Sequence, residues 1–348
     1  GVGALGLEGI IAVSNNEQPR DLALIGAGYW GKNLARNFHQ LGVLRLLCDA
    51  DEAALGRFRA EYDGLETCPD PEQVFTNGTI TRVVIAAPAE LHYRLAKRAL
   101  EAGKDVFVEK PLCLDVAEAE ELIRLADNRQ RILMVGHLLQ YHPCVRKLRD
   151  LSDGGELGQL QYITSNRLNL GKIRREENAL WSFAPHDLSV ILSLAGDRLP
   201  KRVTCTGGSY LTSGVADTTL MAMRFADDVR AHVYVSWLNP FKEQKLTVIG
   251  SEGMLVFDDT LPWEQKLLLF RDHLGWGDGG VPEPNKSPGE PVEVPEDEPL
   301  RCECEHFLEA TANRTAPRTD AHEGLRVLRA LHAAQASLDR DGEPVDIR

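Results

Sequence analysis

The 348-residue sequence lacks the features that mark membrane, metal-binding and disulfide-rich proteins. No apolar run reaches the roughly 18 residues of a membrane-spanning helix. Residues 1–13 are apolar but lack the basic leading region of a secretory signal. The seven cysteines are odd in number and scattered, without the paired spacing of a zinc or redox site. We therefore expect no metal site and a reducing, cytoplasmic location.

Basic residues are also scarce, because 39 lysines and arginines stand against 52 aspartates and glutamates, for a net charge of −13. A surface this acidic repels nucleic acids and anionic membranes, so the composition favours a small-molecule partner. With 43% hydrophobic residues and no internal repeat, the chain is long enough for two domains that each have a core.

A glycine-rich motif follows the first strand-like stretch. Residues 22–25 are apolar and run into Gly26, Gly28 and Gly31, after which residues 32–41 have a helical pattern. In this G-x-G-x-x-G motif the first glycine permits a tight turn, the second lets backbone N–H groups approach a pyrophosphate, and the third allows close helix–strand packing. Glycine-rich turns are common, so the strand–turn–helix setting is what predicts a dinucleotide site.

An acidic residue stands where a dinucleotide fold needs one. The strand-like residues 44–48 end at Asp49, 18 positions after Gly31, where a carboxylate accepts hydrogen bonds from the adenosine ribose. This carboxylate would repel a 2′-phosphate, and the next residues, Ala50, Asp51 and Glu52, include no arginine to neutralise one, so we expect NAD rather than NADP. A helix-capping aspartate is compatible with the same position.

The stretch 105–111, DVFVEKP, organises the rest of the first domain. Residues 106–108 have the pattern of a buried strand, and Lys110 falls just past its C-terminal edge, where ligands bind in an open parallel sheet. Pro111 biases the backbone of Lys110 towards an extended conformation. The alternative is a structural edge lysine paired with Glu109.

Strand and helix patterns alternate around this stretch. Further strands are expected at 81–87 and 132–135, and helices at 90–102 and 115–128. This alternation predicts an α/β fold with a doubly wound parallel sheet, the Rossmann arrangement.

After residue 157 the pattern changes to short strands joined by turns, at 160–166, 201–206, 218–225, 229–237, 245–249, 254–257 and 266–270. Alternating apolar and polar residues in them predict a second, α+β domain with a large, mostly antiparallel open sheet. We also expect a helix at 181–194, a loop at 275–298 and closing helices at 302–312 and 322–338.

Taken together, these motifs resemble those of the Gfo/Idh/MocA oxidoreductases, NAD(P)-dependent sugar and cyclitol dehydrogenases, over about residues 21–340. The features that carry the resemblance are the glycine motif, the switch to an antiparallel sheet, Ala87-Pro88 with His92, Glu109-Lys110-Pro111, and His186 at the head of its helix. The resemblance implies a homodimer or homotetramer. With the sequence pattern, it gives four expected segments: an N-terminal arm or expression remnant at 1–20, an NAD-binding Rossmann domain at 21–141, a substrate-binding and oligomerisation domain at 142–300, and C-terminal helices at 301–348.

The resemblance further implies roles for single residues. Lys110 and His186 would flank the reacting hydroxyl. We expect His186 as acid/base and Lys110 as the group that stabilises the alkoxide, with the reverse assignment left open. The residues expected to hold the cofactor are Gly26, Gly28, Tyr29, Trp30, Gly31, Asp49, Ala87, Pro88, His92, Glu109 and Lys110.

The chain departs from the family at Ser182, because many members carry an aspartate four residues before the helix histidine. A serine orients the imidazole only weakly, and Asp187 faces another way on a helix. The basic stretch 166–175 could bind an anionic substrate tail; a solvated loop balanced by acids is the alternative. The expected substrate contacts are Arg167, Asn169, Lys172, Ser182 and His186.

Residues 168–187, LNLGKIRREENALWSFAPHD, look most like the subgroup that oxidises C3 of nucleotide-linked amino sugars, such as UDP-N-acetylglucosamine or its uronate, ahead of a transaminase. We therefore predict an NAD-dependent dehydrogenase of such a sugar. The alternatives are a 3-dehydrogenase of an aminoglycoside sugar, a cyclitol dehydrogenase, reduction of a keto-sugar, and a non-catalytic NAD sensor. Retention of both Lys110 and His186 argues against the sensor.

Overall fold

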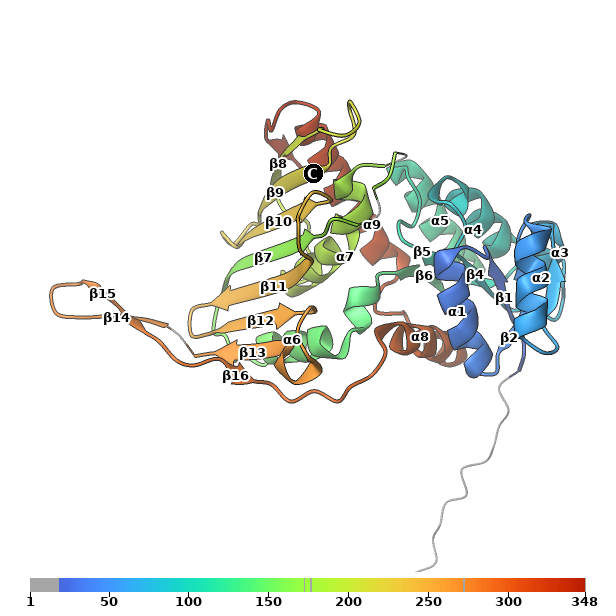
Figure 1. The fold of residues 1–348 in the computed structure, drawn as a ribbon, viewed down its shortest axis with the longest axis horizontal. Coiled ribbons are helices and arrows are strands. Elements are labelled where there is room, and N and C mark those ends of the chain that lie inside the picture. Colours follow the sequence, from blue (N-terminus) through green and yellow to red (C-terminus); the bar gives the residue numbers. More distant parts are fainter. Residues whose placement is uncertain (1–18, 172, 176, 272, 348) are drawn as a thin grey trace, which may run out of the picture.

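The structure, a computed structural model, describes residues 19–347 except 172, 176 and 272. Nearly all of the arm expected at 1–20 lies outside the described residues, and so does Lys172, one of the expected substrate contacts. Two sheets dominate the described chain, and helices lie between them (Figure 1).

The first sheet has six parallel strands in the order β3-β2-β1-β4-β5-β6. These strands are β1 (Leu22–Ile25), β2 (Leu44–Cys48), β3 (Glu66–Cys68), β4 (Arg82–Ile85), β5 (Asp105–Glu109) and β6 (Leu133–Gly136). The strand order reverses between β1 and β4, and ligands bind in such sheets at the carboxyl ends of the strands beside this reversal. The predicted Rossmann sheet is confirmed.

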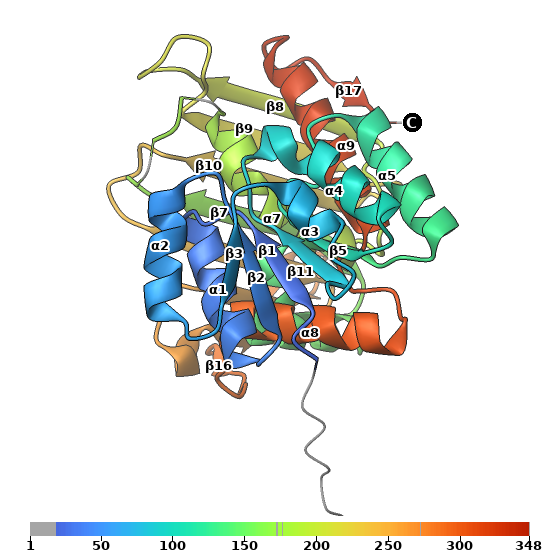
Figure 2. The ribbon, with the colours of Figure 1, turned by 90° about the vertical axis from the view of Figure 1, so that its right-hand side faces the viewer.

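Helices cover both faces of this sheet (Figure 2). One face carries α1 (Tyr29–Gln40) and α2 (Glu52–Glu61), and the other carries α3 (Pro71–Phe75), α4 (His92–Glu101) and α5 (Val116–Arg129). Because both faces are covered, β1, β4, β5 and β6 are buried along their whole length and read as apolar runs rather than alternating patterns.

The second sheet has nine strands in the order β16-β13-β12-β11-β7-β10-β9-β8-β17. They are β7 (Leu160–Leu168), β8 (Arg202–Gly208), β9 (Thr218–Arg224), β10 (Arg230–Ser236), β11 (Glu243–Gly250), β12 (Met254–Asp258), β13 (Leu267–Phe270), β16 (Glu290–Pro291) and β17 (Val345–Asp346). Neighbours are antiparallel except β7 and β10. Buried and more exposed residues alternate along β9 and β11, so one face is closed and the other open. The predicted second sheet is confirmed.

Three helices pack on the closed face of the second sheet: α6 (Pro143–Asp153), α7 (Ala179–Leu194) and α9 (Ala321–Leu338). The helix α9 belongs to both cores, because Leu325 packs in the Rossmann core and Leu331 packs in the core of the second sheet. None of the helices in the described part of the chain is long and apolar enough to cross a membrane.

The helix α8 (Pro299–Asn313) packs against the first domain, where the ring of Phe307 contacts that of Phe38 at 6.5 Å between centroids. An ion pair between Arg36 of α1 and Glu298, the residue before α8, lies at the same junction. The C-terminal part of the chain therefore returns to the Rossmann domain after it has completed the second sheet.

Several sequence expectations need correction. The short elements α2, β3, α3 and α6 were not predicted, and α1 begins at Tyr29 rather than at residue 32, because Gly28 is its N-cap. Residues 275–298 do not form one loop: β14 (His273–Trp276) and β15 (Pro282–Asn285) form a hairpin that projects from the sheet (Figure 1), and β16 pairs with β13. Prolines in β15 and β16 concealed these strands, since proline cannot donate to a ladder.

Candidate active site

The glycine turn after β1 has the shape that a dinucleotide pyrophosphate needs. Gly26 has a φ of +108°, and a Cβ atom there would lie 2.6 Å from the backbone of Ala86. A Cβ on Gly31 would lie 2.0 Å from the carbonyl oxygen of Gly26, whereas a Cβ on Gly28 would meet nothing within 4 Å. Gly28 caps α1 without a side-chain hydrogen bond, so the first N–H groups of the helix are open to an anion. The turn therefore fits the pyrophosphate of NAD.

The next two predicted cofactor residues begin α1. Tyr29 is 80% exposed, and its ring meets that of Trp30 edge-on at 5.8 Å between centroids. Both residues follow Gly28 directly, in the first turn of α1.

Asp49, at the end of β2, holds the glycine turn in place. Its Oδ2 accepts a hydrogen bond from the N–H of Ala27 at 2.7 Å, and its Oδ1 accepts one from the N–H of Asp51 at 2.8 Å. The N-cap of α2 is Asp51, so the alternative interpretation of Asp49 as a helix cap is wrong. Each carboxylate oxygen keeps a lone pair for a ribose hydroxyl.

The turn after β4 carries Ala87 and Pro88 and continues into the short helix η1 (Ala89–Leu91). His92 is buried behind it, with Nδ1 2.7 Å from the carbonyl oxygen of Pro111 and Nε2 2.8 Å from that of Ala87. Burial lowers the pKa of His92, so the neutral ring donates to one carbonyl at a time. Both nitrogens face backbone carbonyls, so His92 holds the two turns together and does not offer a free nitrogen to the cofactor.

The turn after β5 carries the amine of the site. The Nζ of Lys110 donates a hydrogen bond to the carbonyl oxygen of Ser182 in α7, at 3.0 Å. This is the hydrogen bond that its ammonium makes within the described chain, so an edge lysine paired with Glu109 is not what the structure shows. Burial lowers the pKa of Lys110, and the charges of Glu177 and Glu109 oppose that effect. Burial also raises the pKa of Glu109 to about 7, against the opposing charge of Lys110.

The helix α7 brings an imidazole to the same place from the second domain. Pro185 lies inside this helix and lacks the N–H that would bond the carbonyl of Trp181; the next carbonyl, that of Ser182, binds Lys110. His186 follows one turn after Ser182, and its Nδ1 is buried without a hydrogen-bond partner among the described residues. Burial, followed by the charges of Lys110 and Arg167, lowers the pKa of His186 well below its usual value. The imidazole is therefore neutral at physiological pH.

The carboxylate next to His186 has other partners. Asp187 accepts hydrogen bonds from Nε and Nη2 of Arg167 at 2.7 and 3.1 Å, and from Oγ of Ser165 at 2.8 Å. The side chain of Asp187 thus faces β7, as its position on the helix predicts. The guanidinium of Arg167 is tied into this cluster, and Asn169 is bonded through its backbone N–H to Ser236 at the end of β10.

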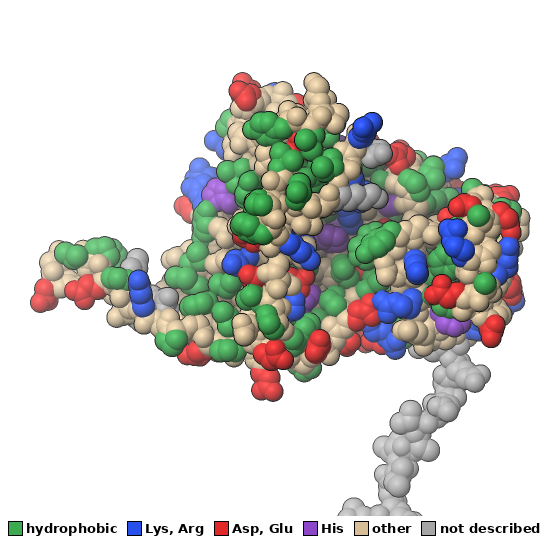
Figure 3. Space-filling model, in the orientation of Figure 1, with side chains coloured by type: hydrophobic (Ala, Val, Ile, Leu, Met, Phe, Trp, Pro, Cys, Tyr) green, Lys and Arg blue, Asp and Glu red, His purple; other side chains and the backbone are tan. Residues whose placement is uncertain are grey.

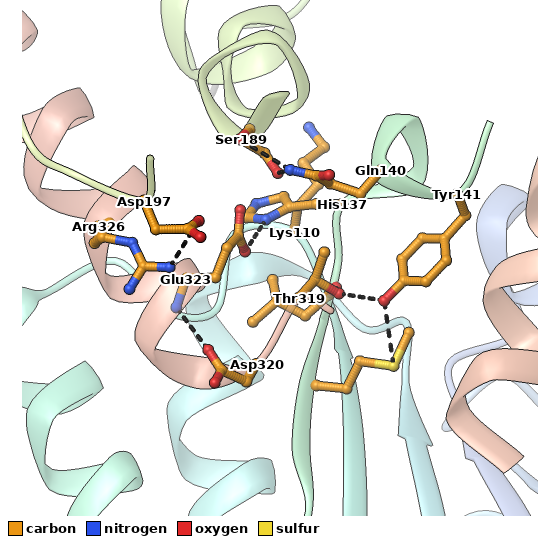
Figure 4. Close-up of polar contacts among 12 residues, drawn as sticks. Lys110, His137, Gln140, Tyr141, Ser189, Asp197, Thr319, Asp320, Glu323 and Arg326 are labelled. Carbon is orange, nitrogen blue, oxygen red and sulfur yellow. Dashed lines mark hydrogen bonds and ion pairs between the residues drawn. The ribbon is translucent and has the colours of Figure 1, made fainter. Parts of the chain in front are cut away.

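Two residues that the sequence analysis missed, His137 and Glu323, lie near His186. His137 follows β6 as Lys110 follows β5, and its Nδ1 is 2.7 Å from Oε2 of Glu323 in the first turn of α9 (Figure 4). The His137 ring stands at 83° to that of His186, with 6.3 Å between the centroids. The rule that placed Lys110 at the edge of the sheet would also have found His137. No local signal points to Glu323.

The sequence analysis also missed Glu303, a carboxyl group buried in the interior. Glu303 of α8 is 1% exposed, and its Oε1 has no hydrogen-bond partner in the described chain. Burial, together with the charge of Glu109, raises the pKa of Glu303 well above its usual value. The folded protein therefore holds the proton of Glu303 more tightly than an exposed glutamate would.

The site opens into a hollow between the two domains, where histidine side chains are visible (Figure 3). A pocket of about 950 Å³ lies beside Lys110 and Ser182, because their chain neighbours Pro111 and Trp181 line it. The second domain adds Arg174 and Arg175 to its wall, along with Ile173, Glu177, Asn178, Gly214, Val215 and Gln335. The predicted substrate contacts that the structure describes, Arg167, Asn169, Ser182 and His186, are not among the residues that line this pocket, and neither is Lys110.

This fold and this glycine turn define an NAD-binding oxidoreductase. Residues 20–137 match the family model for the oxidoreductase family with an NAD-binding Rossmann fold, and residues 145–256 match the GFO/IDH/MocA C-terminal domain. The chain belongs to the Gfo/Idh/MocA oxidoreductase family. The predictions of the family, of an oxidoreductase and of NAD as cofactor are thereby confirmed.

Individual relatives cover most of the chain. The UDP-N-acetylglucosamine 3-dehydrogenase of Acidithiobacillus ferrooxidans is 26% identical over 317 residues, which are 91% of this chain and 96% of that protein. Its crystal structure superposes with a TM-score of 0.80 over 92% of this chain and 97% of that chain, at 25% identity. A crystal structure described as an oxidoreductase of Magnetospirillum magnetotacticum is 30% identical, with a TM-score of 0.78 over 91% of this chain and all of the other.

A third relative is described by a different activity. The 2,7-anhydro-N-acetylneuraminate hydratase of Mediterraneibacter gnavus is 26% identical over 252 residues, which are 68% of this chain and 66% of that protein. Membership of the family therefore identifies the cofactor but does not identify the substrate.

Proposed function

We propose that this protein is an NAD-dependent dehydrogenase that oxidises a secondary hydroxyl, at C3, of an amino sugar carried on a nucleotide. The observation that carries the proposal is the hydrogen bond from Lys110 to Ser182. It joins an amine at the edge of the NAD-binding sheet to the helix turn that precedes His186, so a cation and a neutral imidazole adjoin one site.

The chemistry divides between the two groups. NAD, when bound, accepts the hydride that leaves the carbinol carbon. His186 is uncharged and can accept the hydroxyl proton, and it is the only one of the pair without a hydrogen bond within the described chain. Lys110 as an ammonium stabilises the alkoxide as charge develops on the oxygen. Productive transfer needs the substrate carbon about 3 to 3.5 Å from the acceptor carbon.

The pocket next to Lys110 supports a substrate larger than one sugar ring. Its volume of about 950 Å³ is at the upper end of the usual range for small-molecule sites. Arg174 and Arg175 supply the positive charge for a diphosphate, a role first assigned by sequence to Arg167, Asn169 and Lys172. The Trp181 indole, whose Nε1 donates to Oε1 of Gln335 at 3.1 Å, offers a fixed aromatic face. Similarity to a UDP-N-acetylglucosamine 3-dehydrogenase supports the same substrate class.

The test is a substrate panel with NAD. Formation of NADH is followed by absorbance with UDP-N-acetylglucosamine, its uronate, the free amino sugar, myo-inositol and an aminoglycoside. Turnover with a nucleotide sugar, confirmed as a 3-keto product by mass spectrometry and NMR, is the expected result. Faster turnover with inositol or the aminoglycoside would contradict a nucleotide-sugar substrate. If NAD binds but no substrate yields NADH, the protein would instead be an NAD sensor.

We further propose that the enzyme is a cytoplasmic homo-oligomer that pairs through the open face of the second sheet. All seven cysteines are free thiols, as expected in a reducing compartment. On the open face, Leu220 is 48% exposed and lies opposite Tyr234 of the neighbouring strand. A second copy of the chain would cover these apolar side chains.

A further inference from the structure

A buried histidine and a buried glutamate lie beside the two catalytic candidates, and the chemistry above does not use them. The Nδ1 atom of His137 is 2.7 Å from Oε2 of Glu323, and the two side chains are 1% and 5% exposed (Figure 4). Three separate parts of the chain meet here: the turn after β6 carries His137, α9 carries Glu323, and α7 carries His186.

His137 is also locked to the helix that carries His186. The short helix η2 (Leu138–Tyr141) follows His137, and the Nε2 of Gln140 in η2 donates to the carbonyl oxygen and to Oγ of Ser189 in α7, at 2.9 and 3.1 Å (Figure 4). These hydrogen bonds tie the segment that carries His137 to the helix that carries His186, and the two rings lie nearly perpendicular with 6.3 Å between their centroids.

His186 lacks a carboxylate partner of its own. The helix position one turn earlier holds Ser182, and Asp187 is bound to Arg167 and Ser165. The groups of other elements whose charge lowers the pKa of His186 are Lys110, Arg167 and His137. All three oppose the positive charge that His186 acquires when it accepts a proton.

We infer that His137, held by Glu323, is the positioning residue of His186, and that the pair takes over the orienting role of the carboxylate absent at position 182. The inference rests on the proposed dehydrogenase function. As the hydroxyl O–H bond breaks and an N–H bond forms on His186, the hydride leaves for NAD. His137 fixes the plane of the imidazole, and Glu323 supplies negative charge on the far side of His137 to balance Lys110 and Arg167.

Kinetics of two variants and a matched control test this inference. In His137→Gln and Glu323→Gln we expect kcat to fall about 100-fold, with KM and NAD affinity nearly unchanged, because orientation of the base is lost. The control is Tyr141→Phe, which removes a buried hydrogen bond of 2.8 Å to Thr319 at the same junction but does not reach His186 (Figure 4). If kcat falls no further in these variants than in the control, His137 and Glu323 have only a structural role.

A rescue experiment separates positioning from folding. Ser182→Asp places a carboxylate one helical turn from His186, on the same face. In the Glu323→Gln background it should restore at least a tenth of the lost kcat, whereas in the Tyr141→Phe background it should change little. Failure to rescue a folded double variant would contradict the idea that the pair replaces this carboxylate.

An NMR titration of the histidine ring protons needs no substrate, so it stays informative if every sugar in the panel fails. His137 is one of the groups that lower the pKa of His186, after burial, Lys110 and Arg167. In His137→Gln the His186 resonance should therefore titrate at higher pH than in the wild type, and in Tyr141→Phe it should not move. An unchanged His186 titration in His137→Gln would overturn the inference even in an active dehydrogenase.

Discussion

The Nζ atom of Lys110 and the carbonyl oxygen of Ser182 are 3.0 Å apart, and this hydrogen bond joins the edge of the parallel sheet to α7 of the second domain. Lys110 comes from the edge of the parallel sheet, and Ser182 lies one turn before His186 in α7. The strength of the contact depends on a charge that burial disfavours, since burial lowers the pKa of Lys110. A substrate oxygen that approaches this amine would replace or share the carbonyl.

Removal of the Lys110 amine or the His186 imidazole should sharply lower turnover without weakening the binding of NAD. Lys110→Met and His186→Gln are each expected to lower kcat by about 100-fold or more, because one removes the stabilising cation and the other the base. Isothermal titration with NAD should give affinities within a few-fold of the wild type. Retained turnover in either variant would remove that residue from the mechanism.

The same strand offers a matched control for the lysine. Lys104 precedes β5 at its opposite end, is buried, and donates to the carbonyl oxygens of Asn77 and Ile80 at 2.8 and 2.6 Å. Lys104→Met should lower the melting temperature but leave kcat close to the wild type. A similar kcat loss in both variants would mean that Lys110 acts through stability.

Two glycines of the turn should respond differently to alanine. At Gly26 a Cβ would clash with Ala86 at a φ of +108°, so Gly26→Ala should destabilise the fold by about 1 to 3 kcal/mol and weaken NAD binding. At Gly28 the added Cβ meets no protein atom, so Gly28→Ala should keep the wild-type melting temperature and lose NAD affinity. Thermal melts with and without NAD measure both effects. An unchanged NAD affinity in Gly28→Ala would mean that the pyrophosphate does not bind at this turn.

Stability should depend on pH through the buried carboxyl Glu303. Its folded-state pKa is raised, so the folded protein holds a proton that the unfolded chain releases, and stability falls as pH rises above the usual glutamate value. Glu303→Gln should therefore match the wild type near about pH 5 and be more stable by about 1 to 3 kcal/mol near about pH 8. Denaturant unfolding at both pH values measures this.

Glu305→Gln, an exposed change on the same helix, is the control for that experiment. It should lack the pH-dependent gain, because Glu305 lies at the surface in an ion pair with Arg301. A Glu303→Gln variant whose stability follows the wild type at both pH values would show that Glu303 is not held neutral.

The open face of the second sheet should control the assembly state. Leu220→Arg combined with Tyr234→Arg places two like charges directly opposite each other on neighbouring strands, where a second copy would bury them. Light scattering after size exclusion should show a dimer or tetramer for the wild type and a smaller species for the variant. If wild type and variant have the same mass in solution, the subunit interface does not lie on this face.

The sequence was informative wherever local rules decide the structure. An apolar run that ends at Gly26 marked β1, and one that ends before Lys110-Pro111 marked β5. A residue just past a parallel strand lies at the carboxyl edge of the sheet, which is where the structure has Gly26 and Lys110. The partner of a charged group is a different matter. Glu323 lies 186 residues from His137, and Arg167 could have met many carboxylates before packing brought it to Asp187. Such pairings depend on how distant elements pack, which no periodicity records.

The helix α9 has a mechanical consequence. Its first turns are embedded in one hydrophobic core and its later turns in the other, so the domains cannot hinge apart without tearing apolar contacts from one of them. A hinge motion at α9 that widened the space between the domains would therefore expose side chains such as Leu325 or Leu331 to water, at a cost in free energy.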